Sequence, residues 1–293
     1  GDSAPGDSAP GDSAPGDSAP GDSRSSGDSG SSGEVSASSL ASPPPPVLVL
    51  GMHNSGTTVL AKILHHNGVF MGNSAGLCES NFFTHFINNR ILMGGGDLAW
   101  AQLPILSVDD VLGKFSLVEP WVRNQWRLDY YQWGYDGVSP WGFKDPRLCV
   151  VLPVYLKLFP EASVVLIRRD VDDIAASLAH RQKPGVGVKS DPVFWRELAA
   201  AHLDRAIEYG QKHSRFHILE YEDLCRSPLE TVQGLFRFLN LELPESAHEP
   251  IRKSVRTDRI GTAKWSEARW RMLAWKNRLK PLVAPWYDLL RGR

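Results

Sequence analysis

Short apolar runs alternate with amphipathic stretches from residue 47 onward. Three runs are continuously apolar or nearly so, at residues 47–50, 164–167 and 216–219. Each is followed by apolar residues that recur every three or four positions, which predicts helices over residues 57–66, 172–181 and 229–239. Continuously apolar strands are typical of parallel sheets that helices cover on both faces. The pattern therefore predicts an α/β domain with a central, mainly parallel sheet flanked by helices.

Two stretches depart from this alternation. Residues 94–141 contain five tryptophans and three tyrosines without regular spacing, so we expect an irregular or helical insertion there. Core packing is the favoured role for these rings, and stacking on a sugar or a flat aromatic acceptor is the alternative. From Ala263 the sequence is rich in Trp and Arg and predicts one helix that Pro281 ends.

The first 46 residues have a different composition. Four copies of Gly-Asp-Ser-Ala-Pro are followed by a Gly/Ser/Asp stretch and by four prolines at 43–46, and the only large apolar residues are Val35 and Leu40. So little apolar surface cannot offset the entropy of ordering the backbone. We therefore predict a disordered leader over residues 1–46 that ends in a stiff polyproline spacer, and one domain over residues 47–293.

Charge also divides between these two parts. The net charge of −1 hides a leader with seven acidic residues and one basic residue, so that the rest holds 31 basic and 26 acidic residues. This excess is too small for a nucleic-acid surface, but it suits a pocket for one small polyanion. The three cysteines are too few and too scattered for a disulfide framework or a metal site, so we expect reduced thiols and no metal.

The sequence leaves the compartment open. No run approaches the roughly 20 apolar residues that span a bilayer, so we expect no membrane span in this chain and favour a cytoplasmic location. Because the chain starts at Gly1 and not at Met, a fragment of a membrane-anchored luminal protein is the alternative. Oligomeric state does not follow from the sequence.

A glycine-bearing turn lies between the first predicted strand and the first predicted helix. The first amides of a helix have no internal partners and lie at its positive dipole end, so such a turn can bind an anion. Hydroxyls from the same segment add donors. The alternative is an ordinary tight turn capped by Ser or Thr. The candidate binding residues are His53, Asn54, Ser55, Gly56, Thr57 and Thr58.

The residue after the second glycine of this turn is Thr57. A phosphate-binding loop of the form GxxxxGK[ST] has a lysine there, which reaches the β and γ phosphates. A kinase or ATPase would lack its main cation, whereas amides and hydroxyls could hold a 5′-phosphosulfate. The substitution therefore favours sulfuryl transfer over phosphoryl transfer.

A second motif follows the strand at 164–167. The strand ends in Arg168 and Arg169, and Ser177 lies eight residues after Arg169 on the following helix. Together with the first turn, this resembles the sulfotransferase family, which uses 3′-phosphoadenosine 5′-phosphosulfate (PAPS). The resemblance implies that Arg169 and Ser177 hold the 3′-phosphate, as a guanidinium fork and a hydroxyl can do. The alternative is a solvated cluster in which the two arginines pair with Asp170, Asp172 or Asp173.

The resemblance extends over about residues 47–265. Residues 141–147 are similar to the family's Lys-x-Pro element, and residues 219–228 to its Tyr-Glu-Asp-Leu strand end and the helix that follows. The segment from 259 to 265 resembles the loop that returns over the nucleotide, which implies cofactor contacts from Gly261 and Lys264.

The resemblance also implies two catalytic residues. Residues 79–83 match a Glu-x-x-Phe-Phe element of carbohydrate-type sulfotransferases, in which the glutamate is the catalytic base, so Glu79 takes that role here. Lys144 would stabilise charge on the transferring sulfuryl group. A helix-capping or surface role for Glu79, and a solvated Lys144 before the cap Asp145, are the alternatives. The rival bases are His53, His65, His66 and, above all, His85.

These motifs predict a sulfotransferase closer to the carbohydrate and bacterial types than to the cytosolic aryl type. It would move a sulfuryl group from PAPS to a hydroxyl or amine of a small-molecule or carbohydrate acceptor, without a metal. Asn54 departs from many carbohydrate enzymes, which carry Lys or Arg at that position. A nucleotide kinase and a noncatalytic nucleotide-binding module are the alternative functions.

Overall fold

The computed structural model describes residues 42–72, 77–95, 99–181, 191–255 and 272, all within one unit that runs from Ala41 to Arg293. Residues 1–41 of the predicted leader fall outside this range, as does the predicted C-terminal helix apart from Met272. The fold and the site below concern the described residues alone.

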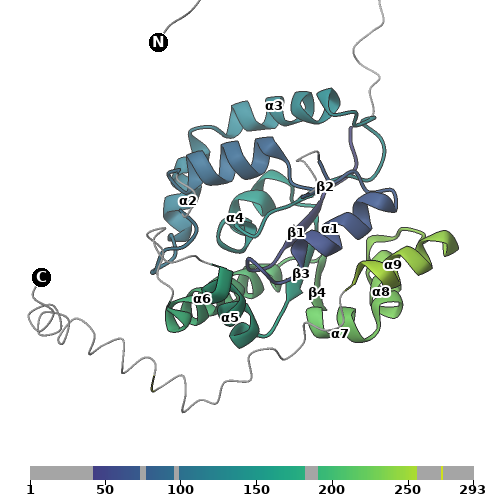
Figure 1. The fold of residues 1–293 in the computed structure, drawn as a ribbon. Coiled ribbons are helices and arrows are strands. Elements are labelled where there is room, and N and C mark those ends of the chain that lie inside the picture. The colour runs from purple at the N-terminus through teal and green to yellow at the C-terminus, as the bar shows by residue number, and fades with distance from the viewer. Residues whose placement is uncertain (1–41, 73–76, 96–98, 182–190, 256–271, 273–293) are drawn as a thin grey trace, which may run out of the picture. The chain divides into compact units, whose positions relative to one another are not determined.

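A four-stranded parallel sheet forms the centre of this unit (Figure 1). Its strands are β1 (Val47–Leu50), β2 (Gly142–Lys144), β3 (Ser163–Arg168) and β4 (Phe216–Glu220), in the order β2-β1-β3-β4. Val49 lies opposite Lys144 on one side and Val165 on the other. The carboxyl ends of β1, β2 and β3 therefore meet at one edge of the sheet. The three predicted strands and the parallel α/β fold class are confirmed.

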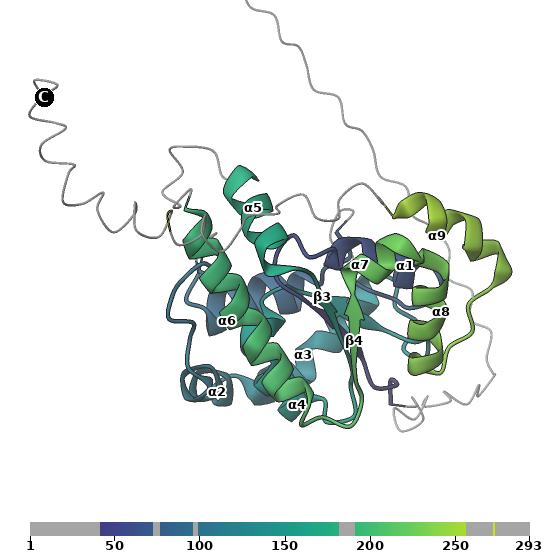
Figure 2. The ribbon, with the colours of Figure 1, turned by 90° about the horizontal axis from the view of Figure 1, so that it is seen from below.

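Side chains alternate between the two faces of the sheet, as the period of a strand requires. Leu48 and Leu50 belong to one hydrophobic core, and Val47 and Val49 to the other. Helices α1 (Thr57–His66), α7 (Tyr221–Arg226), α8 (Pro228–Leu239) and α9 (His248–Ser254) cover the second core. Figure 2 shows α8 and α9 on one side of β3 and β4, with α5 and α6 on the other.

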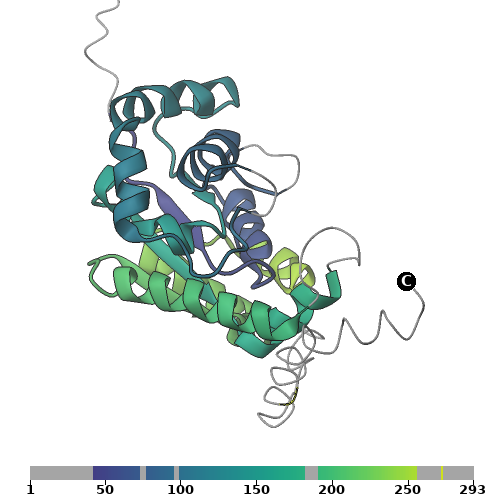
Figure 3. The ribbon, with the colours of Figure 1, turned by 90° about the vertical axis from the view of Figure 1, so that its left-hand side faces the viewer.

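The first core is the larger one. It is covered by α4 (Leu148–Leu158), α5 (Val171–Arg181) and α6 (Pro192–Gly210), and it continues into η1 (Asn81–Leu92), α2 (Val108–Ser116) and α3 (Glu119–Gln132). Figure 3 shows the molecule from the left-hand side of Figure 1, and there the long green helix α6 runs below the blue helices. The short η2 (Glu245–Ala247) precedes α9.

The predicted helices agree closely with the structure. Helix α1 has the predicted bounds, and α5 and α8 each begin one residue earlier than expected. The pattern did not predict β2, η1, α4 or α6. The insertion at 94–141 is largely helical, since α2 and α3 lie within it.

Most aromatic rings of this insertion belong to the core. Trp126 and Trp141 stack with their ring centroids 4.0 Å apart, and Trp100 and Tyr130 are also buried. Trp121, Trp133 and Tyr131 are about 40% exposed. These buried rings pack in the core, which is the role that the sequence favoured for the aromatic residues of this segment.

The end of the polyproline spacer makes hydrogen bonds with the sheet region. Trp141 Nε1 donates to the carbonyl of Pro44 over 2.7 Å, and the Ser163 amide donates to the carbonyl of Pro46 over 2.9 Å. These prolines therefore contact the domain although we grouped them with the leader.

Candidate active site

A cavity of about 310 Å³ lies at the carboxyl ends of the strands. Ligands of open α/β sheets bind at this edge, because the loops and helix N-termini gather there. Nine of the twelve predicted site residues line the cavity, together with Val59, Leu77, Pro146 and Tyr221: His53, Asn54, Gly56, Thr57, Thr58, Glu79, Lys144, Arg169 and Ser177. The other three are Ser55, which does not line it, and Gly261 and Lys264, which lie outside the described residues.

The turn between β1 and α1 requires a left-handed backbone at two positions. Asn54 has φ 67° and Gly56, which precedes the helix, has φ 98°. Asparagine tolerates this region better than most residues, and glycine adopts it without strain. A Cβ on Gly56 would lie 2.6 Å from the Tyr221 ring, so the close packing also requires glycine. The amides at the start of α1 have no intrahelical partners and provide donors for an anion.

Ser55 differs from its neighbours in this turn. It is fully buried, and its backbone amide donates to the Met52 carbonyl over 3.0 Å. Its hydroxyl has no hydrogen-bond partner within the described ranges. The predicted donor therefore faces away from the cavity.

Asn54 joins the turn to the second motif. Its side-chain amide donates to Ser177 Oγ over 3.2 Å. Its backbone carbonyl accepts a hydrogen bond from Arg169 Nη1 over 2.8 Å. Asn54 stands where many carbohydrate enzymes carry a cation. In this protein it links the loop to the two residues expected to hold the 3′-phosphate.

Arg169 is nearly buried, with 5% of its surface exposed. Its Nη2 lies 3.7 Å from Asp173 Oδ2, and its guanidinium carbon lies 4.7 Å from the centre of the Tyr221 ring. Arg168 instead pairs with Glu220 at the exposed edge formed by β4. Arg169 thus pairs with Asp173, as the alternative expected, but it is buried and lines the cavity, whereas Arg168 does not line it.

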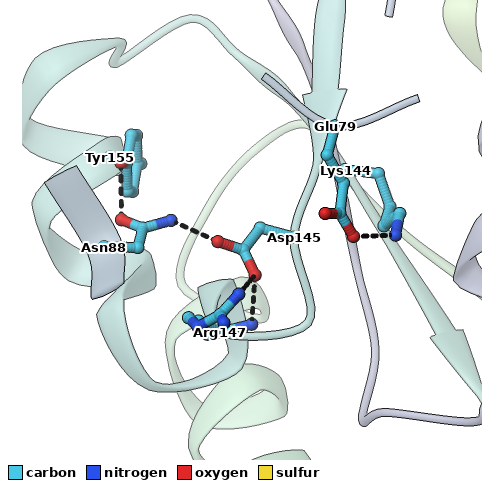
Figure 4. A network of polar contacts seen from close by, with 6 residues as sticks. All are labelled: Glu79, Asn88, Lys144, Asp145, Arg147 and Tyr155. Carbon is cyan, nitrogen blue, oxygen red and sulfur yellow. Dashed lines mark hydrogen bonds and ion pairs between the residues drawn. The ribbon is translucent and has the colours of Figure 1, made fainter. Parts of the chain in front are cut away.

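Glu79 and Lys144 meet at another part of the cavity. Lys144 Nζ donates a hydrogen bond to Glu79 Oε1, and the two form an ion pair (Figure 4). The lysine is only 2% exposed and the glutamate side chain 12%. Ser80, not Glu79, caps η1, since its hydroxyl accepts a hydrogen bond from the Phe83 amide over 3.2 Å. Lys144 is therefore not solvated, and Glu79 is not the cap of η1.

The rival histidines lie elsewhere, apart from His53. His53 lines the cavity and stacks on Trp100, with the ring centroids 3.8 Å apart. His85 lines a different cavity of about 520 Å³ between η1 and α3, and His65 and His66 are exposed on α1. Glu79 is therefore the carboxylate of the described cavity, and His85 is not part of it.

Asp145, which the alternative for Lys144 took as a helix cap, braces the end of β2 and does not cap α4. Helix α4 begins at Leu148 with Arg147 as its N-cap, because the backbone forms a separate turn over 145–147 first. The Asp145 carboxylate accepts hydrogen bonds from the Arg147 amide over 2.9 Å and from Arg147 Nη1 over 3.2 Å. Pro146, between these two residues, lines the cavity.

The three cysteines are buried and none forms a disulfide. Burial raises the pKa of Cys149 to about 12 and raises the pKa of Cys78 and Cys225, so all three are thiols at neutral pH. Among the described residues, no group of three or more His, Cys, Asp or Glu side chains is arranged to hold a metal ion. In the same part of the chain, every helix is too short or too polar to span a bilayer.

Sequence reasoning missed two features of the site. Tyr221 was assigned only to a strand-end motif, yet its ring supports both Gly56 and Arg169. Asn88 donates to Asp145 behind Lys144, and no motif indicated it. Tyr221 directly follows β4, at the edge of the sheet where the cavity lies, and this position could have indicated its place in the site.

The arrangement suits a small polyanion with charge at two ends. Helix amides and hydroxyls lie at the start of α1, the Arg169 guanidinium and the Ser177 hydroxyl line the same cavity, and an ammonium lies beside a carboxylate. Charged donors of this kind bind phosphate and sulfate oxygens strongly. The chemistry of the donors therefore fits a nucleotide that carries a 3′-phosphate and a 5′-phosphosulfate.

Comparisons with known proteins concern the fold and the family of the chain. No curated protein matches the sequence. Solved structures that resemble the chain include the sulfotransferase domain of the olefin synthase from Synechococcus PCC 7002, with a TM-score of 0.50 and 16% identity over 78% of this chain and 83% of that one. Sulfotransferase STF9 from Mycobacterium avium has a TM-score of 0.46 and 16% identity over 85% and 77% of the two chains.

Mouse sulfotransferase SULT7A1, solved in complex with PAP, has a TM-score of 0.44 and 14% identity over 84% of this chain and 82% of that one. At these identities the likeness concerns the fold. The sequence profile described as "Sulfotransferase family" matches residues 45–245, which is more than half of the chain. The chain therefore belongs to the sulfotransferase family.

Proposed function

We propose that this protein transfers a sulfuryl group from PAPS to a hydroxyl or amine of an acceptor, with Glu79 as general base and Lys144 as the cation at the transferring group. The bound donor supplies the activated sulfuryl group. As the acceptor oxygen or nitrogen bonds to sulfur, the bond between sulfur and the bridging oxygen breaks, and Glu79 accepts the acceptor's proton. A positioned base of this kind contributes roughly 10²- to 10⁴-fold to a rate.

One observation carries this function: Glu79 and Lys144 lie in contact inside the cavity that also holds the anion-binding turn. A proton acceptor and a cation are thereby held together next to donors for phosphate. Negative charge develops on the bridging oxygen as it leaves, and a nearby ammonium in a water-poor site stabilises that charge. Arg169 and Ser177 support binding of the 3′-phosphate, because Asn54 holds both beside the turn.

The family assignment favours this function over a nucleotide kinase, in agreement with Thr57 in place of the loop lysine. A noncatalytic nucleotide-binding module differs from an active enzyme in one measurable respect. It would bind 3′,5′-bisphosphoadenosine, the desulfated donor, without transferring sulfate to any acceptor.

The test is transfer of labelled sulfate from PAPS to a panel of small-molecule and glycan acceptors, alongside calorimetric titration of bisphosphoadenosine. Wild-type protein should bind the nucleotide and label at least one acceptor. Glu79→Gln should retain binding and lose roughly 10²- to 10⁴-fold in turnover. Glu245→Gln is the matched control, since Glu245 is exposed near α9 and should leave both measurements unchanged.

Three outcomes would contradict parts of this function. Full turnover by Glu79→Gln would remove Glu79 from the mechanism. Nucleotide binding without transfer to any acceptor would favour the noncatalytic module. Failure of the wild-type protein to bind bisphosphoadenosine would overturn the proposed donor.

A further inference from the structure

A buried polar network lies behind Lys144, on the side away from the cavity. Lys144 and Asp145 are consecutive, yet the lysine lines the cavity whereas the aspartate is fully buried among other side chains (Figure 4). Asp145 Oδ2 accepts from Asn88 Nδ2 over 2.7 Å, and Asn88 Oδ1 accepts from the Tyr155 hydroxyl over 2.6 Å. Arg147 donates twice to Asp145 Oδ1.

The direction of every hydrogen bond in this network is set by the chemistry of its members. A carboxylate only accepts, so the Asn88 amide must turn its NH₂ group toward Asp145 and its oxygen toward Tyr155. Burial raises the pKa of Tyr155, so its hydroxyl remains a donor at working pH. Asn88, Asp145 and Tyr155 are all hydrogen-bonded within this network, whereas Arg147 Nε has no partner among the described residues. A buried chain of hydrogen bonds such as the one through these three residues resists displacement.

The network joins the elements that carry the two proposed catalytic groups. Asn88 lies on η1, which begins two residues after Glu79, and Tyr155 lies on α4. Asp145 directly follows Lys144, and its amide donates to the Val49 carbonyl of β1 over 3.1 Å. Displacing η1 along β2 would therefore break the network and would separate Glu79 from Lys144.

We infer that Asn88, Asp145 and Tyr155 are positioning residues that hold η1 against the end of β2 and so align Glu79 with Lys144 for proton transfer and charge stabilisation. This inference rests on the proposed function. None of the three residues lines the cavity, so each acts through Glu79 and Lys144 and not on the donor or acceptor.

Tyr155→Phe is the least disruptive test, because it removes one hydroxyl and keeps the ring. It should lower kcat about tenfold while the KM for donor and the Kd for bisphosphoadenosine change less than about twofold. A misplacement of about 1 Å can cost roughly 10²-fold, so this loss lies in the expected range. Asp145→Asn should lower kcat further, because the NH₂ group of the new amide would face a donor of Asn88 or Arg147 in place of a carboxylate oxygen. Tyr135→Phe is the matched control, because it removes a buried hydroxyl that donates to the Ser139 carbonyl away from the site.

A double-mutant cycle separates positioning from general destabilisation. If Tyr155 acts by aligning Glu79, Tyr155→Phe should lower the residual rate of Glu79→Gln by less than about twofold, because the aligned group is already gone. An equal tenfold loss in both backgrounds would show a merely structural role and overturn the inference. Unchanged kcat in Tyr155→Phe, with only a lower Tm, would overturn it as well.

Hydrogen exchange followed by mass spectrometry gives a readout that does not depend on activity. Tyr155→Phe should speed amide exchange in peptides that cover residues 79–92 and 142–147, whereas Tyr135→Phe should leave these peptides unchanged. Unaltered exchange there would contradict the inference. The proposed function fails separately: full turnover by Glu79→Gln would remove the base, whereas an inactive Glu79→Gln with unaffected Tyr155→Phe would overturn the positioning role alone.

Discussion

Lys144 donates a hydrogen bond to Glu79 although the two residues lie 65 positions apart in the chain. The ammonium is almost fully buried, and a buried charge is tolerated only with a partner. Removing the glutamate side chain would therefore leave an uncompensated charge and confuse catalysis with folding. Glu79→Gln is the informative variant on the glutamate side, because it keeps the shape of the side chain and an oxygen that can accept the lysine's hydrogen bond.

Lys144→Met should lower kcat by roughly 10²- to 10³-fold, the range for loss of one preorganised group at a developing negative charge. The unbranched methionine fills most of the lysine's volume without burying a charge. Affinity for bisphosphoadenosine, measured by calorimetry, should change little, because that product lacks the sulfuryl group. Lys157→Met is the control, since Lys157 is exposed and pairs with Glu119 away from the site. Wild-type turnover by Lys144→Met would contradict the assigned role.

Arg169→Lys should weaken bisphosphoadenosine binding by roughly 10- to 100-fold, because hydrogen bonds to charged groups contribute about 1.5–3 kcal/mol. A lysine cannot replace the planar fork that we propose for the 3′-phosphate, which also bonds to the backbone carbonyl of Asn54. Arg168→Lys is a control one residue away, at an exposed pair with Glu220. Equal losses in the two variants, measured by calorimetry, would contradict a specific contact between Arg169 and the 3′-phosphate.

Gly56→Ala should cost more stability than Gly68→Ala, although both glycines have positive φ, 98° and 94°. A Cβ at Gly68 meets no atom within 4 Å, so only the backbone strain of about 1–2 kcal/mol applies. At Gly56 the Cβ would overlap the Tyr221 ring, which adds about 1–3 kcal/mol of overpacking. Urea unfolding of both variants measures the difference. Similar losses would mean that Tyr221 moves aside without cost.

The buried His202 should make the free energy of unfolding fall as the pH falls. Burial lowers the pKa of His202 to about 4, offset only in part by the backbone of Trp100. The unfolded state, with a pKa near 6.5, therefore binds more protons than the folded state below neutral pH. Between pH 7.5 and pH 5 this group should remove about 2 kcal/mol from the free energy of unfolding.

His202→Leu removes this titration. The free energy of unfolding of the variant should fall by about 2 kcal/mol less than that of the wild type over the same pH interval. Parallel curves for His202→Leu and wild type would show that another group governs the acid sensitivity.

The sequence indicated the strands that form continuous apolar runs and three helices whose apolar residues recur regularly, and it missed several elements that show neither signal. Strand β2 consists of only Gly, Phe and Lys, so it forms no continuous apolar run. Helix α4 is apolar on all sides and contains Pro153, so it has no amphipathic stripe. Helix η1 is a π-helix in which the Met93 amide reaches the Asn88 carbonyl, and its wider turn breaks the usual spacing of buried residues.

Local sequence determined the groups that can bind and react: a glycine turn before a helix, an arginine at the end of a strand with a serine on the next helix, and a glutamate and a lysine within short motifs. Only the tertiary structure decided which of them meet. Asn54 reaches Ser177 across 123 positions, whereas Ser55 next to it faces the interior and His85 faces another cavity. The physical reason is that periodicity and capping act within a few residues, while the facing of side chains depends on the register of the parallel strands and on how η1 packs against them.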